Sequence, residues 1–282
     1  DERGRLRRAL DEASQGRQVV VSIEGPAGIG KTALVRQFLR ESRGRARVFS
    51  GACSLHEQVS YRLFSSIIDQ VARHLQHRPF GLRDLSYRDE LVRTFPALGA
   101  VPGLSPSRSS RPHDDPEEHE VRRRAFVAFC ELVELLANEE LPLLLWFDNV
   151  HQADRDSLPL LKMLLHARPP SGGRRALLLV FTARAGDAAA QAPEGRDASV
   201  AALLGDLDAR TVTVRGLSAR ESDELARQEL PEVDTATVAR DSGGSPLYIR
   251  HLCRHVRDTK ESVLIPAGAS LAEVLRRRFE AL

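Results

Sequence analysis

The feature that most constrains this chain is a glycine-rich segment of eight residues between two different hydrophobic patterns. The preceding run, Val19–Glu24, is apolar and β-branched, as is typical of a buried strand. The following run, Thr32–Arg40, has the apolar spacing of a helix. The segment fits the pattern G-x-x-x-x-G-K-S/T of a phosphate-binding loop, and its residues are Gly25, Pro26, Ala27, Gly28, Ile29, Gly30, Lys31 and Thr32.

The residue types of this segment, hereafter the phosphate loop, suit a polyphosphate ligand. Glycines let the backbone turn its N–H groups toward an anion, and the positive end of the following helix adds to the attraction. We expect Lys31 to neutralise the β- and γ-phosphates of a nucleotide and Thr32 to hold Mg²⁺. A turn that binds nothing is the alternative. Lysine is rare in this chain, which makes one at the required position informative, since the lysines are only Lys31, Lys162 and Lys260.

Short apolar runs separated by helical patterns predict an α/β fold with a doubly wound, parallel, five-stranded sheet. The strands are expected at Val19–Glu24, Arg47–Gly51, Leu143–Asp148, Leu177–Thr182 and Thr211–Val214. The helices are expected around Leu6–Ala13 and at Thr32–Arg40, Tyr61–Leu75, Arg122–Asn138 and Ser157–His166. Residues 96–116 and 185–200 are rich in small, polar or helix-breaking residues and are interpreted as surface connections.

After Gly216 the strand patterns end, so we divide the chain into an α/β domain, residues 1–215, and a small helical domain, residues 216–282. Ser218 and Glu221 have the spacing of a capping box at the first helix. The last helical pattern has no stop signal, and we therefore expect the chain to be part of a longer protein. The helices are expected at Ala219–Leu230, Thr235–Ser242, Pro246–Arg257 and Ser270–Leu282.

A carboxylate ends the buried strand Leu143–Asp148, and we expect Asp148 to bind Mg²⁺ beside the phosphate loop. The next residue, Asn149, stands where a hydrolytic protein would need a carboxylate base, and an amide cannot accept a proton. Asn149 can still orient water. Two interpretations of Asp154 stay open: it acts as the base, as His151 also could, or it caps the helix that begins near residue 156.

Two further strand and helix ends carry candidate site residues. Thr182 ends an apolar strand and is predicted to sense the γ-phosphate. Arg184 either reaches the same phosphate or forms a salt bridge with a neighbouring loop. Gly243–Leu247 opens a helix with Pro246 in its first turn. Pro246 either only starts that helix or packs on the base of the nucleotide.

Charge and hydropathy exclude several classes of function. The net charge is only +2, which gives no long-range attraction to nucleic acid. The longest uncharged apolar run, Leu141–Phe147, is far too short to span a membrane. No signal peptide is visible, so the expected compartment is the cytoplasm. The cysteines, Cys53, Cys130 and Cys253, form no paired motif and are expected to be reduced core residues.

Four segments in order along the chain resemble the STAND subgroup of AAA-type ATPases: Gly25–Thr32, Phe147–Asp154, Phe181–Arg184 and Gly243–Leu247. The chain is similar to the nucleotide-binding module of large bacterial regulators that also carry LuxR-type DNA-binding or serine/threonine kinase domains. The resemblance implies that the Thr182 strand lies between the phosphate-loop strand and the Asp148 strand. It also implies that Pro246 belongs to a helical lid that closes over the base.

The resemblance implies a switch, in which ADP holds a closed state and ATP with an inducer favours assembly. We therefore expect an ATP- or ADP-binding module with Mg²⁺ and slow hydrolysis. It would relay nucleotide state to other domains of a longer regulator, or to further copies in a nucleotide-dependent oligomer, without direct contact to membrane or nucleic acid. The alternatives are a scaffold that has lost hydrolysis and a motor-like ATPase. The expected catalytic residues are Lys31, Asp148, Asn149 and Arg184.

Overall fold

The computed structural model of the 282-residue chain describes residues 2–53, 60–77, 82–104, 117–138, 140–167, 174–184, 204, 209–231 and 235–259. It divides into two compact units. The sheet unit comprises Asp1–Glu24 and Val35–Val212. The helical unit comprises Gly25–Leu34, which includes the phosphate loop, together with Thr213–Leu282. The predicted domain boundary at residue 215 stays a prediction.

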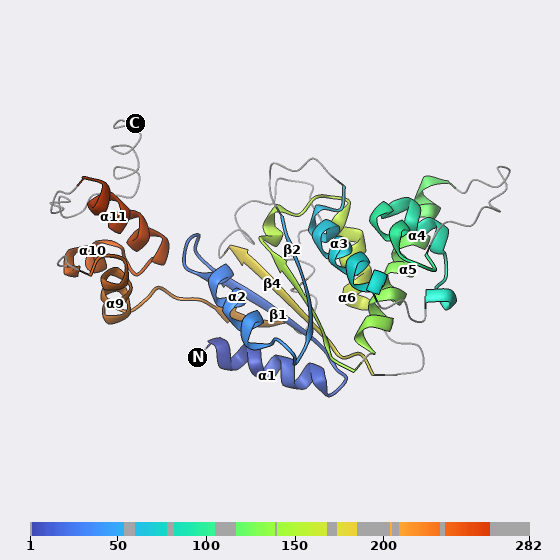
Figure 1. Ribbon diagram of the computed structural model, residues 1–282, viewed down its shortest axis with the longest axis horizontal. Helices are drawn as coiled ribbons and strands as arrows, with labels where there is room; N and C mark the ends of the chain where they lie inside the picture. The colour runs from blue at the N-terminus through green and yellow to red at the C-terminus, as the bar shows by residue number, and fades with distance from the viewer. Residues whose placement is uncertain are drawn as a thin grey trace. The chain divides into compact units, whose positions relative to one another are not determined.

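The centre of the fold is a five-stranded sheet in the order β2-β3-β4-β1-β5 (Figure 1). The expected position of the Thr182 strand is confirmed, because β4 lies between β3 and β1. Strand β3 pairs in parallel with both β2 and β4, as expected of a doubly wound sheet. The strands are β1 (Gln18–Gly25), β2 (Arg47–Ala52), β3 (Leu143–Asp148), β4 (Leu177–Arg184) and β5 (Arg210–Thr213).

Helices follow β1, β2 and β3 as the sequence predicts, and α3 and α6 lie on the same side of the sheet (Figure 1). Their apolar faces meet alternate residues of the central strands, such as Leu145 and Phe147 of β3, in one continuous core. All six residues of β3 are buried, so the sheet is covered on both faces at this central strand. The main helices are α1 (Glu2–Ser14), α2 (Lys31–Glu41), α3 (Arg62–His77), α5 (Glu118–Ala137) and α6 (Ser157–His166).

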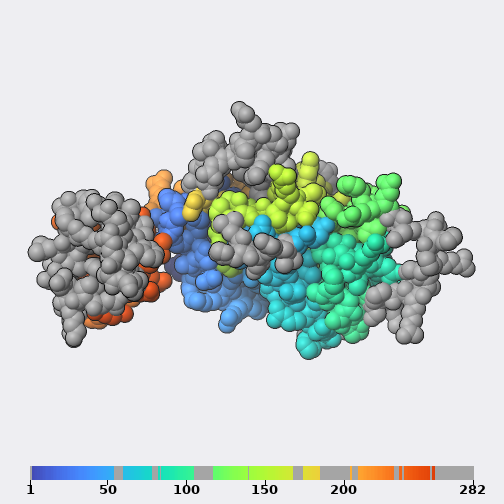
Figure 2. Space-filling view, turned by 90° about the horizontal axis from the view of Figure 1, so that it is seen from above, coloured from blue at the N-terminus to red at the C-terminus, as the bar shows by residue number. Residues whose placement is uncertain are grey.

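The interpretation of residues 96–116 as a surface connection is wrong at its start. Residues 96–100 form the 3-10 helix η2, and Leu98, Val101 and Leu104 have no exposed surface. They join the core beside two elements that the sequence did not predict, η1 (Leu82–Asp84) and α4 (Arg88–Thr94). Figure 2 shows the cyan and green atoms of α3, α4 and α5 adjoining one another. Residues 105–116 and 185–200 lie outside the described residues.

Three short helices of the helical unit pack around a separate small core. The predicted capping box is confirmed: Ser218 Oγ accepts the Glu221 N–H, and the Glu221 carboxylate accepts the Ser218 N–H. The hydrogen bonds from Ser218 lower the pKa of Glu221, since they stabilise its ionised form. The helices are α9 (Ala219–Glu229), α10 (Ala236–Asp241) and α11 (Pro246–Thr259). The expected helix at 270–282 lies outside the described residues.

Two further expectations concern the state of the cysteines and the absence of membrane-spanning segments. The three cysteines are buried and form no disulfide, as expected. Burial raises the pKa of the Cys130 thiol to about 12, which makes it unreactive. Among the described residues, the helices are too short or too polar to cross a bilayer.

Candidate functional site

The ends of β3 and β4 bring Asp148, Asn149 and Thr182 together in the sheet unit. Thr182 Oγ1 donates a short hydrogen bond to Asp148 Oδ1, and the Asn149 N–H donates to Thr182 Oγ1 at 3.0 Å. Thr182 has no exposed surface and Asp148 is 5% exposed. A carboxylate this deeply buried needs hydrogen-bond donors or a cation to offset its desolvation. The Asp148 carboxylate is a hard oxygen ligand of the kind that Mg²⁺ prefers.

Aromatic packing fixes the positions of these strand ends. Phe147 pairs with Phe181 in the register between β3 and β4, and each residue directly precedes a site residue. Their rings are stacked, with centroids 5.1 Å apart, and neither side chain is exposed. Because the strands are parallel and in register, Asp148 and Thr182 follow side by side.

Asn149 has a left-handed backbone, with φ 56°, and it begins the 3-10 helix η3 (Val150–Gln152). Asparagine tolerates this conformation better than most side chains. This turn ends β3 immediately after Asp148, and the Asn149 N–H donates to Thr182 Oγ1. The Asn149 side chain brings no proton acceptor that could serve as a base.

Asp154 is a structural residue in the sheet unit. Its Oδ2 accepts the N–H groups of Tyr61 at 2.9 Å and Ser157 at 3.2 Å, and its Oδ1 accepts the Ser157 hydroxyl at 2.5 Å. These bonds join the start of α6 to the start of α3. The capping interpretation of Asp154 is therefore confirmed, and a carboxylate engaged by three donors is a poor candidate for the general base.

Arg184, the last residue of β4, is exposed. It forms no hydrogen bond or ion pair with other described residues, so the predicted salt bridge to a neighbouring loop finds no partner in that part of the chain. Its predicted contact with the γ-phosphate stays a prediction.

The phosphate loop lies in the helical unit and has the backbone that its glycines permit. Gly28 and Gly30 have φ values of 72° and 104°, which L side chains rarely adopt. Helix α2 begins at Lys31, so its N-terminal amide groups follow directly on the loop. Lys31 Nζ donates to the carbonyl oxygens of Gly25 at 2.8 Å and Pro26 at 2.9 Å. The Lys31 amine therefore lies against the backbone at the start of the phosphate loop.

The start of α11 contacts the phosphate loop within the same unit. The Leu247 N–H donates to the Gly28 carbonyl oxygen at 3.3 Å. A Cβ atom added at Gly28 would come within 2.7 Å of the Leu247 side chain, and one added at Gly30 would approach Pro246 at 3.8 Å. Leu247 is nevertheless 43% exposed. Pro246 and Leu247 thus lie next to the phosphate loop, and the predicted contact of Pro246 with the base stays a prediction.

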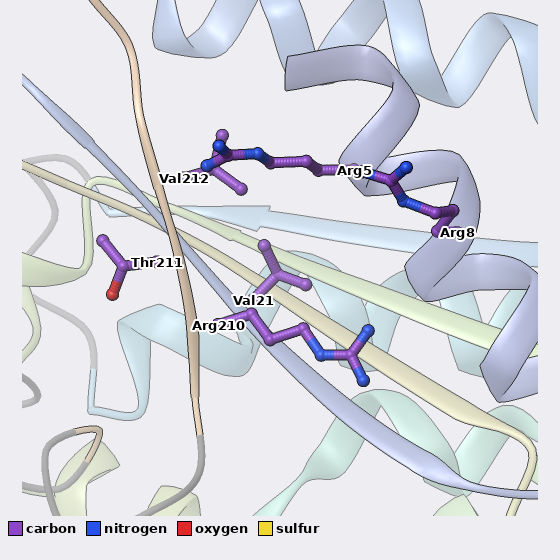
Figure 3. A pocket seen from close by; sticks show the side chains of 6 residues that line it. All are labelled: Arg5, Arg8, Val21, Arg210, Thr211 and Val212. Carbon is purple, nitrogen blue, oxygen red and sulfur yellow. The ribbon is translucent and has the colours of Figure 1, made fainter. Parts of the chain in front are cut away.

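A second concave feature, hereafter the arginine groove, lies between α1 and β5 in the sheet unit (Figure 3). It has a volume of about 340 Å³ and includes none of the predicted site residues. Arg210 is paired with Glu12 through two hydrogen bonds, whereas Arg5 and Arg8 form no ion pair with other described residues. The lining residues are Arg5, Arg8, Val21, Arg210, Thr211 and Val212.

Sequence reasoning missed three features: two hydrogen bonds of the candidate site, from Leu247 to Gly28 and from Thr182 to Asp148, and the separate arginine groove. A signal existed only for the second. Two neighbouring parallel strands that end in Phe147-Asp148 and Phe181-Thr182 place their polar residues side by side, once the strand order is known. The other two depend on tertiary packing.

The sheet, the loop and the strand-end carboxylate define an α/β fold of the P-loop class. Residues 1–181 match the AAA ATPase domain family, and the chain belongs to that family. A curated relative, the hybrid signal transduction histidine kinase G of Dictyostelium discoideum, is 26% identical over 172 residues. That match covers 56% of this chain and 5% of the relative, so the chain spans only a small part of the relative's length.

Two solved structures share the fold. Cdc6p from Pyrobaculum aerophilum is 15% identical with a TM-score of 0.54, over 92% of this chain and 62% of that chain. A Walker-type ATPase of Pyrococcus abyssi is 15% identical with a TM-score of 0.50, over 99% of this chain and 70% of that chain. At this identity the likeness concerns the fold alone.

Proposed function

We propose that this chain is an ATP- or ADP-dependent switch module of the STAND type, with slow ATP hydrolysis, within a larger bacterial regulator. The observation that carries the proposal is the hydrogen bond from the Leu247 N–H at the start of α11 to the Gly28 carbonyl of the phosphate loop. A nucleotide seated on the loop would therefore lie beside a helix that can report its presence. The signalling context is supported by the curated relative, which is a signal transduction kinase.

In this proposal the phosphate loop binds the phosphates of one nucleotide. The backbone N–H groups of Ala27–Thr32, at the loop and the start of α2, bind the phosphates, and Pro246 covers the base. Lys31 exchanges its bonds to Gly25 and Pro26 for the β- and γ-phosphates. Thr32 and Asp148 would hold Mg²⁺, which neutralises phosphate charge. Arg184 would supply a further positive charge toward the γ-phosphate.

A switch requires that ATP and ADP favour different states of α11, because a ligand with equal affinity for both states shifts nothing. The γ-phosphate is the only chemical difference between the two nucleotides. Lys31 is the residue of the loop that can respond to it, since its amine already bonds the loop backbone. Loss or gain of the Lys31 bonds to Gly25 and Pro26 would change the conformation of the phosphate loop, to which the Leu247 N–H is bonded at Gly28.

Hydrogen–deuterium exchange tests the switch directly. We expect ADP and a non-hydrolysable ATP analogue, each with Mg²⁺, to protect the backbone amides of Leu247–Thr259 to different extents. Both should protect the amides of the phosphate loop. The amides of Leu143–Leu145, at the opposite end of β3 from Asp148, serve as the internal control, because these residues are buried. Equal protection of α11 by the two nucleotides would contradict the switch.

The alternative function, a scaffold without hydrolysis, is favoured by Asn149. We expect Asn149→Asp to raise the single-turnover hydrolysis rate by about tenfold or more, since a positioned base contributes about 10²–10⁴-fold. Aspartate also tolerates the left-handed backbone, and the variant keeps the backbone N–H that bonds Thr182.

The control for that experiment is Asn138→Asp, which adds the same charge at the exposed end of α5. Its hydrolysis rate should equal that of the wild type. An unchanged rate in Asn149→Asp would show that the missing carboxylate does not limit hydrolysis. A wild type without measurable turnover, together with normal ATP binding, would favour the scaffold.

A further inference from the structure

The hydroxyl of Thr182 is buried and its one proton is donated to Asp148, although the sequence predicts a contact with the γ-phosphate. We infer that Thr182 is a positioning residue that orients the Asp148 carboxylate for a divalent cation, and that it does not bind the phosphate itself. The inference rests on the proposed function, because it concerns the same nucleotide and the same metal ion. It differs in assigning Thr182 to Asp148 instead of to the ligand.

The hydrogen bonds of the Thr182 hydroxyl support this assignment. A threonine hydroxyl has one proton to donate. That proton goes to Asp148 Oδ1, and the hydroxyl oxygen accepts the Asn149 N–H at 3.0 Å. A contact with a phosphate oxygen would need a donor, and the donor is already committed to a carboxylate. A hydrogen bond from a neutral donor to an ionised carboxylate is strong. Turning the Thr182 proton from Asp148 to a phosphate oxygen would therefore cost free energy.

The surroundings hold this arrangement in place. Thr182 has no exposed surface, and the stacked rings of Phe147 and Phe181 precede the two residues in neighbouring strands. A β-branched side chain in a strand also has few accessible χ1 rotamers. The Asp148 carboxylate is thus fixed in rotation by a rigid partner before any ligand binds.

Fixed carboxylate orientation matters most for a small cation with strict geometry. Mg²⁺ demands near-octahedral ligands, and it tolerates misplaced oxygens poorly. Removal of a group that orients a metal ligand costs about 10–100-fold in metal affinity in other proteins. The expected defect of a Thr182 variant is therefore in the metal dependence of ATP binding, with metal-free binding preserved.

The test compares Thr182→Val with Thr182→Ser in the full chain. Valine keeps the shape and loses the hydroxyl, whereas serine keeps the hydroxyl. ATP affinity is measured by calorimetry with Mg²⁺ and with EDTA, and Mn²⁺ affinity of the ATP complex is measured by electron paramagnetic resonance. We expect Thr182→Val to lose about 10–100-fold in Mn²⁺ affinity. Its ATP affinity in EDTA should equal that of the wild type, and Thr182→Ser should restore Mn²⁺ binding.

A double-mutant comparison separates positioning from direct contact. If Thr182 acts through Asp148, adding Thr182→Val to Asp148→Ala should cause no further loss of Mn²⁺ affinity, because coupled residues are not additive. Additive losses would overturn the inference. Equal losses with and without metal would also overturn it, in favour of direct phosphate binding.

Two outcomes keep the test decisive. Should the valine variant fail to fold, Thr182→Ser alone remains informative, since loss of Mn²⁺ affinity with the hydroxyl retained would contradict the inference. Wild-type protein that binds no nucleotide would overturn the proposed function and this inference with it. If the wild type binds nucleotide and Thr182→Val keeps the metal dependence of the wild type, only the role of Thr182 is overturned.

Discussion

Replacement of Lys31 by alanine is expected to weaken ATP binding by about 30-fold or more. Removing one partner of a desolvated, hydrogen-bonded charge pair costs about 2–5 kcal/mol, which corresponds to that factor at its lower end. Lys31 is the cation of the phosphate loop, and its amine lies within 2.9 Å of two loop carbonyls. The loss should be larger for ATP than for ADP, because the γ-phosphate carries the additional charge. Calorimetric titration of both nucleotides measures the effect.

The control is Lys162→Ala, which removes an exposed lysine from α6. This variant should bind both nucleotides as the wild type does. Circular dichroism shows whether Lys31→Ala keeps the secondary structure, since the loop carbonyls lose their donor in that variant. Normal ATP affinity in Lys31→Ala would defeat the assignment of Gly25–Thr32 as a phosphate loop.

Replacement of Asp148 by alanine is expected to remove most of the Mg²⁺-dependent gain in ATP affinity. The carboxylate is buried at the end of β3, and in this account it is the protein's charged ligand for the cation. The loss should be at least the 10–100-fold expected for removing an orienting group, since a ligand itself is lost. ATP affinity in EDTA should change little, because the phosphate loop is intact.

Two variants make the Asp148 experiment specific. Asp148→Asn keeps the size and an acceptor for Thr182 Oγ1 and removes the charge, so it should lose the Mg²⁺ dependence without unfolding. Asp69→Ala removes an exposed carboxylate from α3 and should leave the Mg²⁺ dependence unchanged. The role of Asp148 would be refuted by a full Mg²⁺ response in Asp148→Asn.

The strands and the main helices of the fold could be predicted because their signals are local. Uninterrupted apolar runs such as Leu143–Asp148 and Leu177–Thr182 are typical of strands buried on both faces, and both are strands in the structure. The capping box at Ser218 is also local, since its two partners are three residues apart. The order of the strands came from resemblance to a family and not from the residues themselves.

The region around α4 could not be predicted because its elements are too short for a period to show. Helix α4 has seven residues and η2 has five, and a proline and a glycine lie within η2. Their burial depends on contacts with α3 and α5, which are distant in the sequence. Composition therefore suggested a surface connection where Leu98 and Val101 are core residues.

The candidate site was predicted as a set of residues but not as a set of contacts. The motif spacing indicated Gly25–Thr32, Asp148, Thr182 and Pro246, because each follows or precedes a recognisable strand or helix. It did not indicate that the Thr182 proton is donated to Asp148, or that the Leu247 N–H bonds Gly28. Hydrogen-bond direction depends on atomic positions that a one-dimensional pattern does not contain.

A crystal structure of the chain with a non-hydrolysable ATP analogue and Mg²⁺ tests the central claim most directly. The account predicts the triphosphate against the N–H groups of Ala27–Thr32, Lys31 on the β- and γ-phosphates, Asp148 on the side of the cation and Pro246 on the base. A nucleotide bound instead in the arginine groove, with the phosphate loop closed by Lys31 and Leu247, would contradict it.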